Sequence, residues 1–538
     1  MKIIKILVAI CTAFYIQTSA QIKNIQYSGY ETIFENINVN KKINLNFDKA
    51  IIGNNTIFIP NIKSADRSDM IFSIDKSTLK RKGYYTFKHE KVIYQIIDFA
   101  FDSASNKLFA LYVEKVKTGE LIVSLNVFTE SMELILKRNI SILNKYGNKI
   151  YLYSKDNNLL LVYPEMDNDK NIQVRYELYD SNLNKIQSNI VNIPLKGVYS
   201  EFGRPDFDFL SNSFDDQGNF YGLINAITND KRKFQRNFPL LLKINISKND
   251  AKIVDLSSKI DDYSLQALFM SKIINGKTKI VGLAGNIGND GKVNNLTRLF
   301  LMKLDLTNEN IDFFQVFKVN QSQIDKSANV NESFFVDYQS NPNEVFFNSY
   351  VLESVNYGKS TIIFYTYWNF NENGDRIIMT SIDKNGLLSY ISINDNKIEY
   401  IKLFSTYIKK THPEYFTKLS PLIIDNKLFA FHLIPYDVSE YKFDNKEINK
   451  NNILQALKYF YVNIETGDIK VKADYLKNEN NMPISISYLG FPNKICFNAK
   501  EKEIYIYLMS MKINKNKILP ASSSSPKLKD SYFGKISF

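Results

Sequence analysis

The sequence predicts an all-β protein, and three observations lead to that prediction. Apolar and polar residues alternate with a period of two in short runs such as 242–246, 302–306 and 460–464, a pattern typical of strands with one buried face. Each run ends in residues that favour turns, such as Asn, Asp, Ser and Gly. Gly (20) and Pro (13) are scarce while aromatic residues make up 14% of the chain, which excludes collagen-like and low-complexity proteins.

The length of 538 residues favours either three or four ordinary domains or one architecture that grows by repetition. Turns between amphipathic strands recur along the whole chain, which favours repetition. They fall near Asp75, Thr129, Asp180, 247–250, 307–310, Asp383 and 465–468. A second series of more apolar hairpins alternates with them, with turns near Gly53, 102–106, 155–158, 215–219, 275–276, 341–343, 425–426 and 500–502.

An apolar hairpin followed by an amphipathic hairpin forms a four-stranded sheet whose inner strands are buried on both faces and whose outer strands are wetter. Repetition of this unit predicts a single β-propeller of seven or eight four-stranded antiparallel blades. The expected blades cover 43–87, 94–138, 148–191, 207–257, 265–317, 333–404 and 418–474. An eighth set at 485–510 has no long outer hairpin, and either the tail 531–538 or the segment 26–38 is expected to complete it.

One turn carries a repeat signature. Residues 215–221 read Asp-Asp-Gln-Gly-Asn-Phe-Tyr, which resembles the D-x-x-G-N-x-Y signature of NHL-type propeller repeats. The match is clear in this blade alone, and residues 101–109 match the signature only in part. The resemblance therefore covers the β-propeller superfamily rather than a specific member. It implies a fold without implying an activity.

Residues 1–20 read as a secretory signal peptide. A positively charged start precedes the apolar run 6–16, which is too short to span a bilayer, and cleavage is expected between Ala20 and Gln21. The propeller is then expected to occupy 21–538. After cleavage the protein is expected to be secreted, periplasmic or attached to the cell surface, with no transmembrane segment.

Charge and cysteine content narrow the expected partners. The net charge of +12 reflects a lysine-rich composition, and we expect an extracellular ligand or protein partner and no nucleic acid. Cys496 is the one cysteine that remains after cleavage, so no internal disulfide is expected. The chain is expected to be a monomer, with short helices at 261–272 and 452–458 and a Ser/Pro-rich loop at 520–526.

The expected strand order predicts a functional face. In each blade the turns within the two hairpins fall on one face of the ring, and the connections between hairpins and between blades fall on the other. The second kind includes long segments at 192–206, 226–238, 285–298, 318–331, 351–375, 405–417 and 435–456. Function on a rigid scaffold concentrates in such loops, so ligand binding is expected on that face. The alternative explanation of these long loops is that loop length varies without any functional role.

A basic cluster is the most specific candidate site on that face. Arg232, Lys233 and Arg236 lie in one expected loop, and Arg204 lies in the connection that enters the same blade. Guanidinium groups bind carboxylate, sulfate or phosphate through paired hydrogen bonds, which favours an anionic ligand. The alternative is a solvated basic loop.

Other residues offer different chemistry. Asp206 and Asp208 begin an expected innermost strand, where paired carboxylates can hold a cation or perform acid–base catalysis. Trp368 belongs either to a sugar-stacking platform in an extra hairpin or to the packing of that hairpin. His412 is expected on the loop face, and a turn before Pro413 is the favoured explanation of this residue. No cofactor is expected. The three histidines lack metal-ligand spacing, and residues 167–178 lack the Gly and Glu of a calcium loop.

These features predict a secreted, non-catalytic β-propeller that binds an anionic glycan or a protein partner through its loop-rich face. The alternative is an extracellular propeller enzyme, such as a carbohydrate hydrolase, lyase or lactonase, with carboxylates at the channel mouth. A third class is a structural subunit of a surface assembly. Acidic or metal-binding side chains that converge at the channel mouth would favour an enzyme, whereas a broad aromatic or basic platform would favour a binding module.

Overall fold

The computed structural model consists of β-strands joined by turns, and the part of the chain that it describes contains no α-helix. It describes residues 24–29, 49–61, 68–88, 96–117, 120–142, 150–166, 172–193, 209–230, 234–256, 260, 263–287, 293–317, 324–325, 350–357, 360–369, 385–394, 397–407, 422–424, 427–437, 453–463, 469–472, 495–498, 500–509 and 531–537. The all-β prediction is confirmed. The helices expected at 261–272 and 452–458 are wrong, because β18 (Tyr263–Met270) and β29 (Ile453–Asn463) occupy these positions. Pairing within a sheet overrides a local helix preference.

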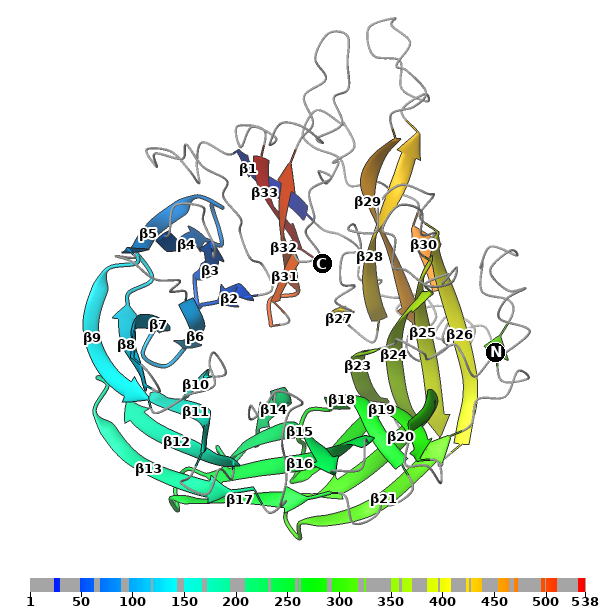
Figure 1. The fold of residues 1–538 in the computed structure, drawn as a ribbon. Helices are drawn as coiled ribbons and strands as arrows, with labels where there is room; N and C mark the ends of the chain where they lie inside the picture. The colour runs from blue at the N-terminus through cyan, green and yellow to red at the C-terminus, as the bar shows by residue number, and fades with distance from the viewer. Residues whose placement is uncertain are drawn as a thin grey trace, which may run out of the picture.

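Eight sheets surround a common centre (Figure 1). The chain is therefore a β-propeller with eight blades, the larger of the two predicted numbers. The first blade contains β2 (Ile51–Ile52), β3 (Thr56–Asn61), β4 (Ser68–Asp75) and β5 (Arg81–Lys88), and the second contains β6 (Ile96–Asp102), β7 (Lys107–Lys117), β8 (Glu120–Phe128) and β9 (Leu134–Ile142). The third blade contains β10 (Tyr151–Lys155), β11 (Asn158–Met166), β12 (Ile172–Asp180) and β13 (Lys185–Asn192). The fourth contains β14 (Phe209–Phe214), β15 (Phe220–Asp230), β16 (Phe234–Asn245) and β17 (Asp250–Asp255).

We letter the four strands of each blade A to D, from the innermost to the outermost, and the later blades have the same strand order as the first four. The fifth contains β18, β19 (Lys277–Ile287), β20 (Val293–Asp305) and β21 (Asn310–Phe317); the sixth β23 (Tyr350–Tyr357), β24 (Ser360–Asn369), β25 (Asn385–Asn394) and β26 (Lys397–Tyr407); and the seventh β27 (Leu422–Ile424), β28 (Lys427–Asp437), β29 and β30 (Ile469–Lys472). The short strand β22 (Ile324–Asp325) pairs in parallel with β26 and makes the sixth sheet five-stranded.

The eighth blade closes the ring with strands from both ends of the described chain. Its order is β31 (Ile495–Asn498), β32 (Glu503–Met509), β33 (Ser531–Ser537) and β1 (Asn24–Gly29). Strands β33 and β1 are antiparallel, with Asn24 opposite Ser537. The sequence suggested either the tail or the N-terminal segment as the missing part of this blade, and the structure uses both. The strands nearest to the centre of the ring are β2, β6, β10, β14, β18, β23, β27 and β31 (Figure 1).

Adjacent blades pack through apolar side chains. In β11, Leu159 and Leu161 belong to a cluster shared with the second blade, whereas Leu160 and Val162 belong to one shared with the fourth. All four side chains are almost completely buried. The outermost strand β9 is instead exposed over most of its length. Inner strands are thus buried on both faces and outer strands are wetter, as the alternation of the sequence predicts.

The outer hairpins share one irregularity. In five of the described C–D hairpins the register shifts immediately after the turn, so that one residue of the outermost strand has no partner on its neighbour. These residues are Lys82, Ile135, Ile186, Asp312 and Glu399. Such a β-bulge bends the edge of a sheet and leaves its extra residue unpaired. Its repetition at one place shows that these blades share one hairpin geometry.

The sequence misplaced the turns of the sixth blade. Its inner hairpin is connected through 358–359 and its outer hairpin through 395–396, so the turns expected at 341–343 and Asp383 are wrong. Trp368 lies in β24, an ordinary strand of this blade, and not in an extra hairpin. Residues that favour turns also occur in connections between hairpins, and period-two alternation alone does not distinguish the two cases.

Candidate functional site

The two faces of the ring differ in the length of their connections. The A–B and C–D turns share one end of every antiparallel blade, which we call the turn face, and the longest covers 271–276. The opposite end, the loop-rich face, carries connections such as 194–208, 370–384 and 473–494, which lie outside the described residues. The strand bounds agree with the predicted asymmetry. Three expected loops, 226–238, 285–298 and 351–375, are wrong. Strands β15 and β16 leave only 231–233 between them, β19 and β20 leave only 288–292, and β23 and β24 occupy most of 351–375.

The D-x-x-G-N-x-Y turn is a self-contained hydrogen-bonded unit on the turn face. The Asp215 carboxylate accepts hydrogen bonds from the backbone N–H groups of Gln217 (2.9 Å) and Asn219 (2.8 Å), and from the Asn219 amide and the Tyr221 hydroxyl. Gly218 has φ +83°, a conformation that glycine adopts without strain. These contacts explain each fixed position of the signature. They assign it to turn formation and not to ligand binding.

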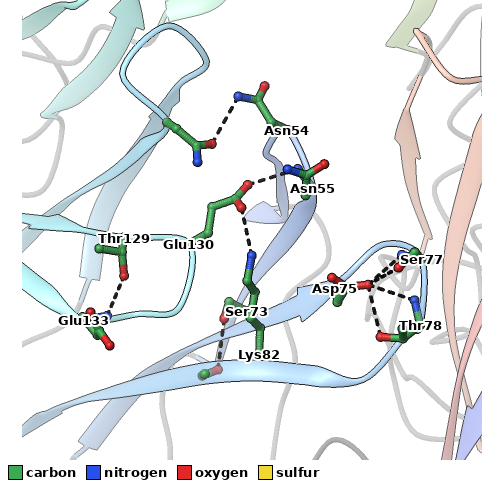
Figure 2. Close-up of polar contacts among 12 residues, drawn as sticks. Asn54, Asn55, Ser73, Asp75, Ser77, Thr78, Lys82, Thr129, Glu130 and Glu133 are labelled. Carbon is green, nitrogen blue, oxygen red and sulfur yellow. Dashed lines mark hydrogen bonds and ion pairs between the residues drawn. The ribbon is translucent and has the colours of Figure 1, made fainter.

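The turns of neighbouring blades are joined by buried polar contacts, and Figure 2 shows the case between the first and second blades. The Glu130 carboxylate accepts hydrogen bonds from the Asn55 N–H (3.0 Å) and from Lys82 Nζ (3.0 Å). Burial acts to raise the pKa of Glu130, but these two donors hold the pKa below its usual value. Glu130 therefore stays ionised and joins the two blades.

Lysines make equivalent contacts around the ring. Each extends from a strand of one blade to a backbone carbonyl in a turn of the next blade, at 2.8–3.3 Å. The pairs are Lys107 with Ser181, Lys155 with Asp215, Lys243 with Leu306, and Lys535 with Lys76. The last pair crosses the closure between the eighth and first blades. The turn face is therefore built as a set of linked turns, which restrains rotation of one blade against another.

The sequence analysis missed one buried carboxylate near the centre of the ring. Asp98 lies in β6, the innermost strand of the second blade, where the register with β7 shifts. Its Oδ2 accepts a hydrogen bond from the Leu152 N–H of the next blade (2.9 Å), and its Oδ1 accepts one from Phe99 N–H (3.0 Å). Burial raises the pKa of Asp98 to about 6, against the opposing effects of these donors and of Lys49.

Ser211 makes the same kind of contact in the fourth blade as Asp98 makes in the second. Ser211 lies at the corresponding register shift of β14, and its Oγ accepts a hydrogen bond from the Met270 N–H of the next blade (3.0 Å). Both side chains thus join an innermost strand to the backbone of the following innermost strand. This shared geometry assigns Asp98 to the connection between blades. The available signal in the sequence was a single carboxylate inside an otherwise apolar run.

Three carboxylates of the turn face, those of Asp75, Asp180 and Asp305, accept hydrogen bonds from their own turns. Asp75 Oδ1 accepts hydrogen bonds from the backbone and hydroxyl groups of Ser77 and Thr78 (Figure 2). The hydrogen bond from the Ser77 hydroxyl is the largest of several that lower the pKa of Asp75 to about 2. Asp180 and Asp305 accept equivalent backbone hydrogen bonds. In the described part of the chain, no three His, Cys, Asp or Glu side chains come together as metal ligands.

Two of the residues predicted to bind a ligand lie in described strands. Arg236 is opposite Thr228 and Trp368 is opposite Gly386, so both lie toward the loop-rich end of their blades. The others lie outside the described residues: Arg204, Asp206, Asp208, Arg232, Lys233 and His412, together with Ala20 and Gln21 of the expected cleavage site. Across the residues whose structure is described, there is no helix with the length and hydropathy needed to span a membrane.

Comparisons with known proteins give similarity in fold and none in sequence. No protein-family model matches the chain, and no curated protein sequence matches it. A solved structure of the WD40 domain of SCAP from fission yeast is similar at 9% identity and a TM-score of 0.40, over 96% of this chain and 98% of that one. The polysaccharide lyase Uly1 is similar at 10% identity and a TM-score of 0.38, over 96% and 99%. A Synechocystis apocarotenoid oxygenase mutant is similar at 7% identity and a TM-score of 0.31, over 71% and 78%. The propeller assignment rests on the sheet order of this chain itself.

Proposed function

We propose that the protein is an exported, non-catalytic binding module that binds an anionic glycan on its loop-rich face. The observation that carries this proposal is the asymmetry of the ring. One face consists of short turns linked across the blades by buried lysine and glutamate contacts, and the long connections are confined to the other face. Rigid scaffolds of this kind bind through the loops that they hold in place.

Charge supports an anionic ligand. The chain has a net charge of +12, and Arg236 lies near the start of the third strand of the fourth blade, close to Arg232 and Lys233 in sequence. Arg204 precedes the same blade. An arginine pair binds sulfate or carboxylate groups through charge-assisted hydrogen bonds. The carboxylates described so far are used in turns or between blades, which gives no support to an enzyme at those positions.

A thermal-shift experiment tests this function. The purified protein is melted with heparin, polygalacturonate or neutral dextran, because a ligand that binds only the folded state raises the melting temperature. We expect heparin or polygalacturonate to raise it and dextran to leave it unchanged. The melting temperature is also measured with calcium alone and with a chelator.

A matched pair of variants locates the site. We expect Arg204→Ala with Arg236→Ala to abolish the shift. Lys248→Ala with Lys272→Ala should keep it, because these exposed lysines lie on the turn face. Equal loss in both variants would show non-specific charge attraction and overturn the proposal. A shift with calcium alone would instead favour an enzyme with carboxylates at the channel mouth.

A further inference from the structure

Two lysines lie directly opposite each other in the fifth blade. Lys279 of β19 is paired with Lys303 of β20, and both residues are partly buried. Their neighbours Ile280 and Met302 belong to the apolar cluster shared with the fourth blade, so the two lysines lie on the other face of this sheet. Opposed residues have Cβ atoms about 4.5–5.5 Å apart, and like charges at such positions are destabilising. Two positive charges are therefore unfavourable at this place.

The fourth blade has a different pair at the corresponding position. Lys243 and Lys303 are each the third residue from the end of strand C of their blades. Tyr221 of β15 is opposite Lys243, and the Lys243 ammonium lies 5.9 Å from the centre of the Tyr221 ring. An aromatic ring stabilises a cation that faces it. The fifth blade therefore has an amine, that of Lys279, where the fourth blade has an aromatic ring.

The surroundings of the two lysines differ. The Lys303 ammonium lies 4.9 Å from the centre of the ring of Phe313, which is opposite it on β21, and this ring stabilises the charged form of Lys303. Burial lowers the pKa of Lys279 to about 8, and the charge of Lys303 acts in the same direction. The one carboxylate of β19 and β20 belongs to Asp305, which is opposite Lys277. Lys279 is therefore the member of the pair that gives up its proton more easily.

We propose that Lys279 is a modification site that forms an imine with small aldehydes, and that Lys303 opposite it promotes this reaction. The Lys279 ammonium first releases a proton to solvent. The lone pair of Nζ then attacks the carbonyl carbon of the aldehyde, and the resulting carbinolamine loses water to leave a carbon–nitrogen double bond. No group is oxidised or reduced in these steps. A lysine that is partly desolvated and placed beside a second cation is activated as a nucleophile in this way.

Reductive methylation of the purified, folded protein tests this proposal. Limiting formaldehyde is the aldehyde probe, cyanoborohydride supplies the hydride that traps each imine as methyl-lysine, and mass spectrometry of peptides gives the rate at each lysine. At pH 7 we expect Lys279 to react at least about tenfold faster than the exposed Lys248 and Lys272, because a larger fraction of its amine is neutral. The rate at Lys279 should level off above pH 8, whereas the rates at the two exposed lysines should continue to rise.

Two variants at position 303 test the role of the opposite charge. Lys303→Met removes the cation and should slow the reaction of Lys279 at pH 7 by about threefold or more, whereas Lys303→Arg keeps the cation and should react like the wild type. Lys137→Met, in the second blade, is the control and should leave the rate at Lys279 unchanged. Equal rates at Lys279 and at the exposed lysines, or an unchanged rate in Lys303→Met, would overturn the proposal. An equal loss in Lys303→Met and Lys303→Arg would also overturn it, because it would assign Lys303 to packing and not to charge.

Discussion

Two junctions between blades are built differently. The second and third blades meet through one large apolar cluster that includes Phe109, Leu161 and Tyr179. The eighth and first blades meet at the closure of the ring, where Lys76 forms an ion pair with Glu501 at 2.7 Å and Lys535 donates to the Lys76 carbonyl. Consecutive blades thus pack through residues that alternation makes apolar. The closure adds an ion pair between two residues 425 positions apart.

The difference predicts unequal responses to mutation, and the apolar junction should give the largest. Leu161 is completely buried between the second and third blades. Leu161→Ala removes its apolar contacts and leaves a cavity, so we expect the free energy of unfolding to fall by about 2–5 kcal/mol. Urea denaturation measures this change. A loss below about 0.5 kcal/mol would mean that the two blades do not depend on this cluster.

Asp98 is a buried carboxylate within that junction, and its effect should depend on pH. Its pKa in the folded protein is raised from the usual 3.8 to about 6, so the ionised carboxylate destabilises the fold. Its contribution is therefore most favourable below pH 4 and declines as the pH rises through 6. Asn at position 98 still offers an oxygen to the Leu152 N–H but never ionises.

We therefore expect Asp98→Asn to gain about 1–3 kcal/mol relative to the wild type between pH 4 and pH 7.5. Urea denaturation at the two pH values measures this change. Ser211→Ala is the control, because it removes the equivalent hydrogen bond without removing a titrating group. Its cost should be about 0.5–1.5 kcal/mol at both pH values. A pH-independent Asp98→Asn difference would contradict the assignment.

The closing ion pair should have a smaller effect than Leu161 or Asp98, and its effect should depend on salt. The side chain of Lys76 is 10% exposed and that of Glu501 is 40% exposed, so solvent screens the pair in part. We expect Lys76→Met to cost about 1–2 kcal/mol at low salt, and less as salt is raised. Lys137→Met removes an ion pair within the second blade whose side chains are 45% and 24% exposed, and should cost less than about 1 kcal/mol. Equal losses in the two variants would contradict a special role for the closure.

The sequence predicts the blades well because a propeller repeats a local pattern. Alternation located the outer turns at Asp75, Thr129 and Asp180, and the structure confirms them. The alternation pattern misplaced the outer turn of the sixth blade, where Asp383 lies before β25 and not between β25 and β26. It also left the closing strand undecided, because the pairing of β1 with β33 joins the ends of the chain and no local pattern specifies it.

The functional residues were harder to predict for a different reason. The repeat signature at Asp215 explains a turn, and the loop-rich face follows from strand order, but neither specifies a ligand. Asp98 was missed because its role depends on the Leu152 N–H of another blade. The exposure of Ile135 and Ile186 was missed because an isoleucine in a strand normally indicates burial. Only the bulge, which the structure shows, turns Ile135 and Ile186 outward.

The closure of the ring by both ends can be tested directly with an engineered disulfide. Paired residues of antiparallel strands have Cα atoms about 4.5–5.5 Å apart, within the range that a disulfide spans. Asn24→Cys and Ser537→Cys, in a chain with Cys11→Ser and Cys496→Ser, place two thiols at paired positions of β1 and β33. Asn24→Cys with Ser188→Cys is the control, because Ser188 lies on the outer strand of the third blade.

After oxidation of the folded protein, mass spectrometry of linked peptides reports whether the two positions meet. An eight-bladed ring closed by β1 and β33 predicts a disulfide within one chain for the 24/537 pair and none for the 24/188 pair. Absence of the 24/537 link, or equal formation of both links, would contradict the closed ring.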